Sequence, residues 1–281
     1  IQCLHGMMEY KERYLEVMSY FAKKGYVCVI HDHKGHGKNA ETLGYFGLGD
    51  GWYQLIVDTK QVSDYIKEQY PTLPHILLGH SMGSMVARSY YKRYPSDIDA
   101  MVLTGAPYYD PLSAVAGIVS KAVLFFKGSK HPSKTLNKLF FMQANKKYKN
   151  LDWLSENAEN VKAYLNDPLC GQLFTASGYY YLAKGMKDMH DYTDFKEDAS
   201  QTPILFVAGA DDPIIGGEKG LKDSMDVFKK SGFSDISKHI YENKRHEILL
   251  ESNREEVYKN IVDWLNGYFK EDTAAKISKT S

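Results

Sequence analysis

The stretch His75-Ile-Leu-Leu-Gly-His-Ser-Met-Gly-Ser84 decides the fold of this chain. Its apolar run at residues 76–78 predicts a buried strand, and residues 85–94, which contain no glycine or proline, predict a helix. The pattern Gly-x-Ser-x-Gly at residues 79–83 is typical of a nucleophile elbow, a sharp strand-to-helix turn that exposes one hydroxyl. A plain tight turn is the alternative. We therefore expect Ser81 to be exposed, with the N–H groups of a helix N-terminus behind it.

Strands and helices alternate along much of the remaining chain. Apolar runs predict strands over residues 1–4, 26–30, 76–78, 100–104, 203–208 and 237–241. Helical periodicity predicts helices over residues 10–24, 55–70, 85–94, 217–230 and 253–269. This alternation predicts an α/β fold with a mostly parallel, doubly wound sheet.

Residues 107–199 interrupt the alternation, because they show no clear strand. They predict a helical cap, inserted after the strand at 100–104 and lying over the strand ends where open α/β sheets bind ligands. We therefore expect a discontinuous core of residues 1–106 and 200–270. The polar residues 271–281 predict a flexible tail.

The composition excludes several classes of protein. With 35 basic and 35 acidic residues the formal net charge is +0, which argues against nucleic-acid binding. Cys3, Cys28 and Cys170 are odd in number and far apart, so we expect buried thiols rather than disulfides. No apolar run approaches the length of a transmembrane helix. We expect a cytoplasmic protein, with further residues upstream because Ile1 already lies in a predicted strand.

The histidine-rich run at residues 31–37, His-Asp-His-Lys-Gly-His-Gly, is a candidate metal site. Alternate residues of an extended chain face opposite ways, and no cysteine or glutamate completes a ligand set. We therefore predict a structured, glycine-rich loop and no metal.

The residues after the later strands supply partners for Ser81. A serine hydroxyl becomes a good nucleophile when a histidine, oriented by a carboxylate, accepts its proton. Asp211 and Asp212 follow the strand at 203–208, and His246 follows the strand at 237–241, so all would meet at one edge of the sheet. Both aspartates are candidates, and the stiff Pro213 favours Asp212. His80 is not assigned as the base, because a neighbour of Ser81 in the turn points elsewhere.

Two backbone N–H groups are expected to form an oxyanion hole. One belongs to Met82, directly after the serine, and the other to Met7, which follows His5-Gly6 in the loop after the first strand. The alternative for His5-Gly6 is an ordinary turn.

Together these motifs resemble the monoacylglycerol lipase/lysophospholipase group of α/β-hydrolases, the serine aminopeptidase S33-type hydrolases. The resemblance covers about residues 1–105 and 203–265, and Lys34 stands where that group usually has arginine or valine. It is carried by HGMME at 5–9, RY at 13–14, DHKGHG at 32–37, GHSMG at 79–83, GADD at 209–212 and RHE at 245–247.

The resemblance implies a serine esterase that uses Ser81, Asp212 and His246, passes through an acyl-enzyme and needs no cofactor. The implied substrates are lipid-like esters, monoacylglycerol or lysophospholipid. The cap would then supply the acyl pocket. Five apolar residues are candidates for acyl contact or for docking on a membrane or micelle surface, with ordinary packing as the alternative: Val115, Ile118, Val119, Val123 and Phe126.

Other functions stay open at this point. Within enzymes they are a carboxylesterase for short or aromatic acyl esters, and a peptidase. A dehalogenase is disfavoured, because that chemistry needs a carboxylate at position 81. Outside enzymes, the scaffold also suits a non-catalytic binding protein, although such proteins usually lose a member of the triad.

Overall fold

The computed structural model describes residues 1–281 except 48, 150, 194, 196–200 and 279–281, and it describes no side chains beyond residue 269. Its centre is a six-stranded, all-parallel sheet in the order β2-β1-β3-β4-β5-β6. The strands are β1 Gln2–Leu4, β2 Val29–Ile30, β3 Ile76–His80, β4 Ala100–Thr104, β5 Ile204–Gly209 and β6 Ile236–Tyr241. The predicted α/β fold is confirmed.

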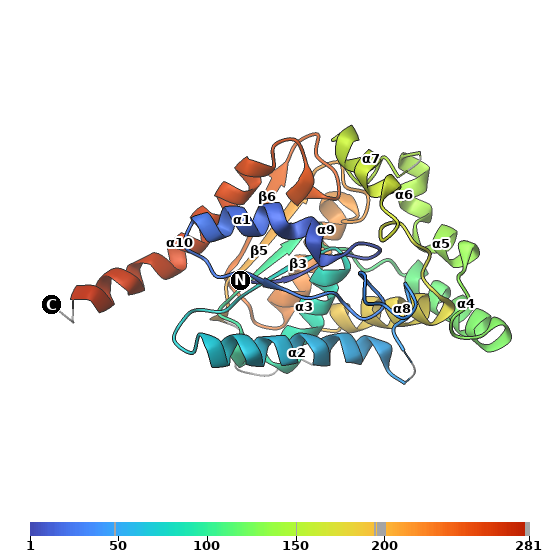
Figure 1. Ribbon diagram of the computed structural model, residues 1–281, viewed down its shortest axis with the longest axis horizontal. Coiled ribbons are helices and arrows are strands. Elements are labelled where there is room, and N and C mark those ends of the chain that lie inside the picture. Colours follow the sequence, from blue (N-terminus) through green and yellow to red (C-terminus); the bar gives the residue numbers. More distant parts are fainter. Residues whose placement is uncertain (48, 150, 194, 196–200, 279–281) are drawn as a thin grey trace.

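Successive side chains of a strand point to opposite faces, and here both faces are apolar. Leu77, Met101 and Phe206 belong to one buried cluster, while Leu78 and Val102 belong to the other. Helices therefore cover the sheet on both sides (Figure 1). One side carries α1 Leu15–Lys23 and α10 Arg254–Ser278; the other carries α2 Gly51–Gln69, α3 Met82–Arg93 and α9 Gly217–Lys230. Short 3-10 helices span Lys11–Tyr14, Pro95–Asp97 and Ile248–Leu250.

The helices between β4 and β5 form an inserted segment, and they gather at one end of the sheet (Figure 1). Its last helix packs on α2 and α3 of the core and on the first helix of the segment. We predicted that the chain returns to the core near residue 200. Residues 196–200 lie outside the described part, so this domain boundary stays a prediction. The helices are α4 Leu112–Lys127, α5 Lys134–Phe140, α6 Met142–Lys147, α7 Ala158–Asn166 and α8 Ala176–His190.

Several predicted boundaries were wrong; α2, for example, begins at Gly51 rather than at residue 55. The strand predicted over residues 26–30 is reduced to Val29–Ile30, because β2 is an edge strand whose one neighbour, β1, is three residues long. Helix α10 continues to Ser278, past its predicted end at Phe269. The flexible tail predicted over 271–281 stays a prediction, since the side chains there and residues 279–281 lie outside the described part.

In the described part, no helix has the length and apolarity needed to cross a membrane.

Candidate active site

Ser81 lies at the turn between β3 and α3, and its backbone is in the left-handed region with φ 50° and ψ −118°. Few non-glycine residues adopt this conformation, which is typical of a strained functional turn. The neighbouring glycines let it close. A Cβ on Gly79 would lie 2.5 Å from the carbonyl oxygen of Gly83, and a Cβ on Gly83 would overlap the carbonyl oxygen of Leu4. The turn lies beside β1, where the sheet order reverses and α/β folds bind ligands.

Three side chains from separate strand ends form one hydrogen-bonded chain. His246 Nε2 lies 2.8 Å from Ser81 Oγ, and His246 Nδ1 lies 2.9 Å from Asp212 Oδ2. The other carboxylate oxygen, Oδ1, accepts the N–H of Ile214 at 2.8 Å. With its proton on Nδ1, the ring donates to Asp212 and leaves Nε2 free to accept the serine proton.

The choice between the two aspartates is visible in the geometry. Asp212 is buried against His246, whereas the Asp211 side chain is 45% exposed and its Oδ1 lies 3.2 Å from Lys147 Nζ. The stiff turn at Pro213 therefore directs the second carboxylate, not the first, toward the histidine.

The electrostatics around His246 favour a positive ring. Burial alone lowers its pKa, but the Asp212 carboxylate, with further help from Glu247 and Glu9, outweighs burial and leaves the pKa raised. A raised pKa strengthens Nε2 as a proton acceptor and stabilises the imidazolium that forms when Ser81 gives up its proton.

His80 is held in another role. Its ring centre lies 4.9 Å from that of His246, and its Nδ1 lies 3.1 Å from Thr104 Oγ1. Burial, and then the charge of His246, lower the pKa of His80 well below its usual range. It is a neutral neighbour of His246 rather than a partner of Ser81.

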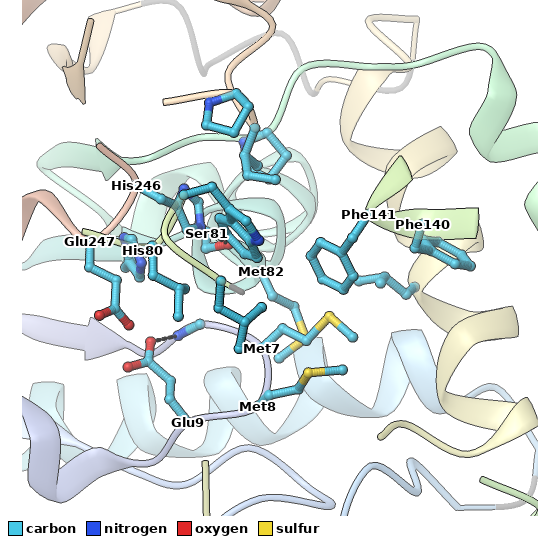
Figure 2. A pocket seen from close by; sticks show the side chains of 18 of the residues that line it. Met7, Met8, Glu9, His80, Ser81, Met82, Phe140, Phe141, His246 and Glu247 are labelled. Atoms are coloured by element: carbon cyan, nitrogen blue, oxygen red, sulfur yellow. Dashed lines mark hydrogen bonds between the residues drawn. The ribbon is translucent and has the colours of Figure 1, made fainter. Parts of the chain in front are cut away.

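Met7 and Met82, the two expected oxyanion donors, both line the cavity at Ser81 (Figure 2). Met82 is the first residue of α3, and the first N–H groups of a helix have no partner within it. After Met7 the chain turns sharply, since Met8 has φ 59°. The Met8 carbonyl accepts the N–H of Gly171 at 3.0 Å, so the inserted segment supports this turn.

A largely apolar cavity of about 200 Å³ opens at Ser81. In Figure 2, Met7, Met8, Phe140 and Phe141 extend to one side of the serine, and Glu9 and Glu247 lie on the other. We did not predict most of its apolar wall from the sequence, because the wall joins segments that are distant along the chain: Met8, Met85, Phe140, Phe141, Leu151, Trp153, Leu154, Leu182, Met186 and Ile214.

The candidate acyl contacts on α4 lie away from this cavity. None of Val115, Ile118, Val119, Val123 and Phe126 lines the cavity. Val119 and Val123 pack against the core cluster, while Val115, Ile118 and Phe126 are exposed on the outer surface. The helix buries Ser113 and Ser120 and exposes several large apolar side chains, so an apolar stripe in its sequence does not reveal which face turns inward.

A buried ionic cluster beside Ser81 and His246 was not predicted from the sequence. Arg13 bridges Glu9 and Glu247, with its Nη1 2.7 Å from Glu9 Oε2 and 2.6 Å from Glu247 Oε1. Glu9 and Arg13 lie in the motif at the first loop, and Glu247 adjoins His246. No local pattern pairs residues 234 positions apart, so proximity to the two motifs was the one available signal.

The histidine-rich loop folds into a buried cluster, in which the ring centres of His5 and His33 lie 4.4 Å apart and those of His31 and His33 5.2 Å apart. Burial, together with the neighbouring rings, lowers the pKa of His5 and His33 well below the usual range. Among the described residues, no group of histidine, cysteine, aspartate or glutamate has the geometry to hold a metal ion.

Comparisons with other proteins identify the family of the chain. A family model described as serine aminopeptidase, S33, matches residues 1–253. A monoacylglycerol lipase of Mycolicibacterium smegmatis is 27% identical over 265 residues, which are 93% of this chain and 85% of that protein. Phospholipase YtpA of Bacillus subtilis is 26% identical over 265 residues, 92% of each chain.

A solved structure gives the same result. The thermostable carboxyl esterase from Bacillus coagulans, in complex with glycerol, matches with a TM-score of 0.85 and 26% identity, covering 95% of this chain and 88% of that one. The chain therefore belongs to the serine aminopeptidase S33 family of α/β-hydrolases, the group that includes these lipases and esterases, and is an ester-hydrolysing enzyme.

Proposed function

We propose that this enzyme hydrolyses monoacylglycerols through a Ser81–His246–Asp212 triad and an acyl-enzyme. The observation that carries the proposal is the continuous hydrogen-bonded chain from Ser81 Oγ to Asp212 Oδ2, with the serine facing an apolar cavity.

In the first half of the reaction, His246 Nε2 accepts the hydroxyl proton while Ser81 Oγ attacks the ester carbonyl carbon. The carbonyl oxygen becomes an oxyanion, which the N–H groups of Met7 and Met82 stabilise. The imidazolium then gives its proton to the departing alcohol oxygen, the C–O bond breaks, and the acyl group stays on Ser81.

The second half repeats these roles with water. His246 takes a proton from a water molecule, whose oxygen attacks the acyl carbon and forms a second oxyanion. Return of that proton to Ser81 Oγ releases the fatty acid and restores the enzyme. Throughout, Asp212 keeps the ring oriented and stabilises its charged form.

The cavity favours an uncharged head group. Its lining includes the carboxylates of Glu9, Asp110 and Glu247 but, in the part of the chain that the structure describes, no lysine or arginine. A phosphate head group would meet like charge there without a cationic partner, which is costly in a partly desolvated site. A glycerol head group carries no charge and can donate a hydroxyl to the carboxylate of Asp110, since the oxygens of Glu9 and Glu247 already accept hydrogen bonds within the protein.

Two measurements test the proposal. A fluorophosphonate probe should label Ser81, and Ser81→Ala should abolish both labelling and ester hydrolysis, while Ser96→Ala, an exposed serine at the opposite edge of the sheet, should retain both. Rates are then compared for a monoacylglycerol and a lysophosphatidylcholine with the same acyl chain. Faster cleavage of the lysophospholipid would overturn the head-group assignment, and hydrolysis by Ser81→Ala would overturn the mechanism.

We also propose that α4 contacts the lipid surface from which the substrate is drawn. Ile118, Phe125 and Phe126 are 73%, 80% and 81% exposed, so α4 presents large apolar side chains on its outer side. Residues 111–149 contain eight lysines and no acidic residue, in a chain of zero net charge. This combination suits a lipid surface that carries negative charge.

A further inference from the structure

The side chain of Glu9 supports the turn that carries Met7. Glu9 Oε1 accepts the Gly6 N–H at 2.5 Å, the bond drawn as a dashed line at Glu9 in Figure 2. The same oxygen accepts the Tyr14 hydroxyl at 2.9 Å. A Cβ placed on Gly6 would lie 2.6 Å from Glu9 Oε1 and 3.3 Å from Ser81 Cβ. The Gly6–Met7 peptide is therefore enclosed between this carboxylate and the nucleophile.

Glu9 is itself fixed to the loop of the catalytic histidine. Arg13 donates Nη1 to Glu9 Oε2 at 2.7 Å and forms a two-point contact with Glu247, at 2.6 Å to Oε1 and 2.9 Å to Oε2. Arg13, Glu9 and Glu247 are at least nine-tenths buried. Paired, charge-assisted bonds of this kind are short and directional, so they fix the relative position of the two loops.

Residues of the inserted segment complete the hydrogen bonds of this ionic cluster. Asn160 on α7 donates to Glu247 Oε2 at 2.6 Å and accepts from Arg13 Nη2 at 3.1 Å, and the guanidinium lies 5.0 Å from the centre of the Tyr164 ring. Each carboxylate oxygen of Glu9 and Glu247 thus accepts at least one hydrogen bond. A cluster satisfied in this way can keep its charges while buried.

We propose that Glu9 is a positioning residue for the oxyanion hole, and that the Arg13–Glu247 bridge ties that hole to the loop of His246. The inference rests on the proposed mechanism. By fixing the Gly6 N–H, Glu9 orients the next peptide, whose N–H belongs to Met7 and faces the developing oxyanion. Glu9 stabilises the transition state through this peptide and does not touch the substrate.

The main test separates transition-state binding from substrate binding. Glu9→Ala should lower kcat on the order of 10- to 100-fold with little change in KM, because a misplaced donor weakens chiefly the transition state. Binding of an alkyl boronic acid, which forms a tetrahedral adduct with Ser81, should weaken by a similar factor. Binding of an uncleavable ether analogue of the substrate should not change. Glu9→Gln, which keeps a carbonyl oxygen for Gly6, should recover part of kcat.

The bridge to His246 has its own readout. Because Glu247 contributes to the raised pKa of His246, Glu247→Gln should move the acid limb of the kcat/KM profile to lower pH. A purely structural role would lower activity without moving that limb.

A matched control is Asp97→Asn, which removes a carboxylate bonded to Tyr90 and Lys67. Asp97 lies just before β4, at the end of the sheet opposite to Ser81. This substitution should cost stability without changing the ratio of boronate to ether affinity. Should Glu9→Ala fail to fold, Tyr14→Phe removes a second bond to the same oxygen and should give a smaller loss of kcat with the same signature.

The outcomes separate the two proposals. A wild-type protein whose Ser81 is not labelled by the fluorophosphonate overturns the mechanism, and the role of Glu9 with it. A labelled, active wild type together with a folded Glu9→Ala variant that keeps kcat within threefold overturns the role of Glu9 alone. Equal losses of boronate and ether affinity would also overturn it, since they would indicate a collapsed cavity.

Discussion

Asp211 and Asp212 are neighbours in the sequence but lie in opposite environments. Asp212 is buried and bonded to His246, while the Asp211 side chain is partly exposed beside Lys147. Asp212→Asn should lower kcat by about 10³- to 10⁴-fold, because an amide neither fixes the Nδ1–H tautomer nor stabilises the imidazolium. Asp211→Asn should stay within about threefold, as expected for an exposed ion pair. Steady-state kinetics on a p-nitrophenyl ester decide the question, and the reverse order would exclude Asp212 as the acid.

Arg88 presents a different problem, because it is a buried charge to which no carboxylate of the described residues is bonded. Its Nη1 contacts the Pro107 carbonyl at 3.3 Å, but Nε and Nη2 have no hydrogen-bond partner among the described residues. Burial lowers its pKa to about 10, so the group is still charged at pH 7.

Replacing that charge should stabilise the fold. Arg88→Met keeps much of the volume and should raise the free energy of unfolding by about 1–3 kcal/mol, as when buried ions give way to apolar side chains. Urea denaturation at pH 7 measures this change. A loss of stability greater than about 1 kcal/mol would show that the guanidinium contributes more in the fold than its desolvation costs.

At the scale of a whole element, α4 is the test of lipid-surface contact. Replacing Ile118, Phe125 and Phe126 together by serine should reduce sedimentation with vesicles of phosphatidylcholine and phosphatidylglycerol by roughly tenfold or more, because about 0.8 kcal/mol is lost for each methylene no longer buried. Leu15→Ser, at an exposed leucine on α1, should leave sedimentation unchanged.

The lysines near α4 predict the lipid preference. Binding of the unmodified enzyme should weaken when phosphatidylglycerol is omitted or salt is raised, since screening removes the attraction of the eight lysines. Equal binding of the triple variant and the unmodified enzyme would contradict a role for α4.

The elements also show what the sequence reveals and what it conceals. Strands β3, β4 and β5 were predictable, because short apolar runs bounded by turns have few other solutions in an alternating chain. The short β2 was not, since its length depends on its neighbour β1 rather than on its own residues. The inward face of α4 was equally hard to predict, because this helix buries two serines and exposes large apolar side chains, the reverse of the usual pattern.

For the whole molecule, the same reasoning explains why the meeting of Ser81, His246 and Asp212 was predictable and the ionic cluster was not. In a parallel sheet the carboxyl ends of all strands lie on the same side of the sheet. Ser81, Asp212 and His246 each follow such an end, so they can meet once the order of the strands is known. The pairing of Arg13 with Glu247 depends instead on how two loops and α7 pack, which no spacing encodes.

A property of the whole fold follows from its buried histidines. Burial lowers the pKa of both His36 and His75 to about 4, against an ordinary value of 6.5, and it also lowers the pKa of His5, His31, His33 and His80. In the unfolded chain these rings gain protons near pH 6.5, while in the folded protein His36 and His75 resist protonation until about pH 4. The stability they support is therefore present above pH 6.5 and is lost as the pH falls toward 4.

The loss should be large enough to unfold the protein. His36 and His75 each account for on the order of 3 kcal/mol by pH 4, and together they approach the whole stability of a typical domain. We expect urea midpoints to fall steadily from pH 6.5 to 4. His75 lies before β3, at the edge opposite Ser81, so His75→Gln tests the cause without disturbing the triad. As the pH falls, the free energy of unfolding of this variant should decrease by about 1.4 kcal/mol less per pH unit than that of the unmodified protein, because one buried histidine fewer gains a proton on unfolding. In acid the variant should therefore become the more stable of the two proteins. Parallel stability curves for the two proteins between pH 8 and 4.5 would show that His75 is not a source of the acid sensitivity.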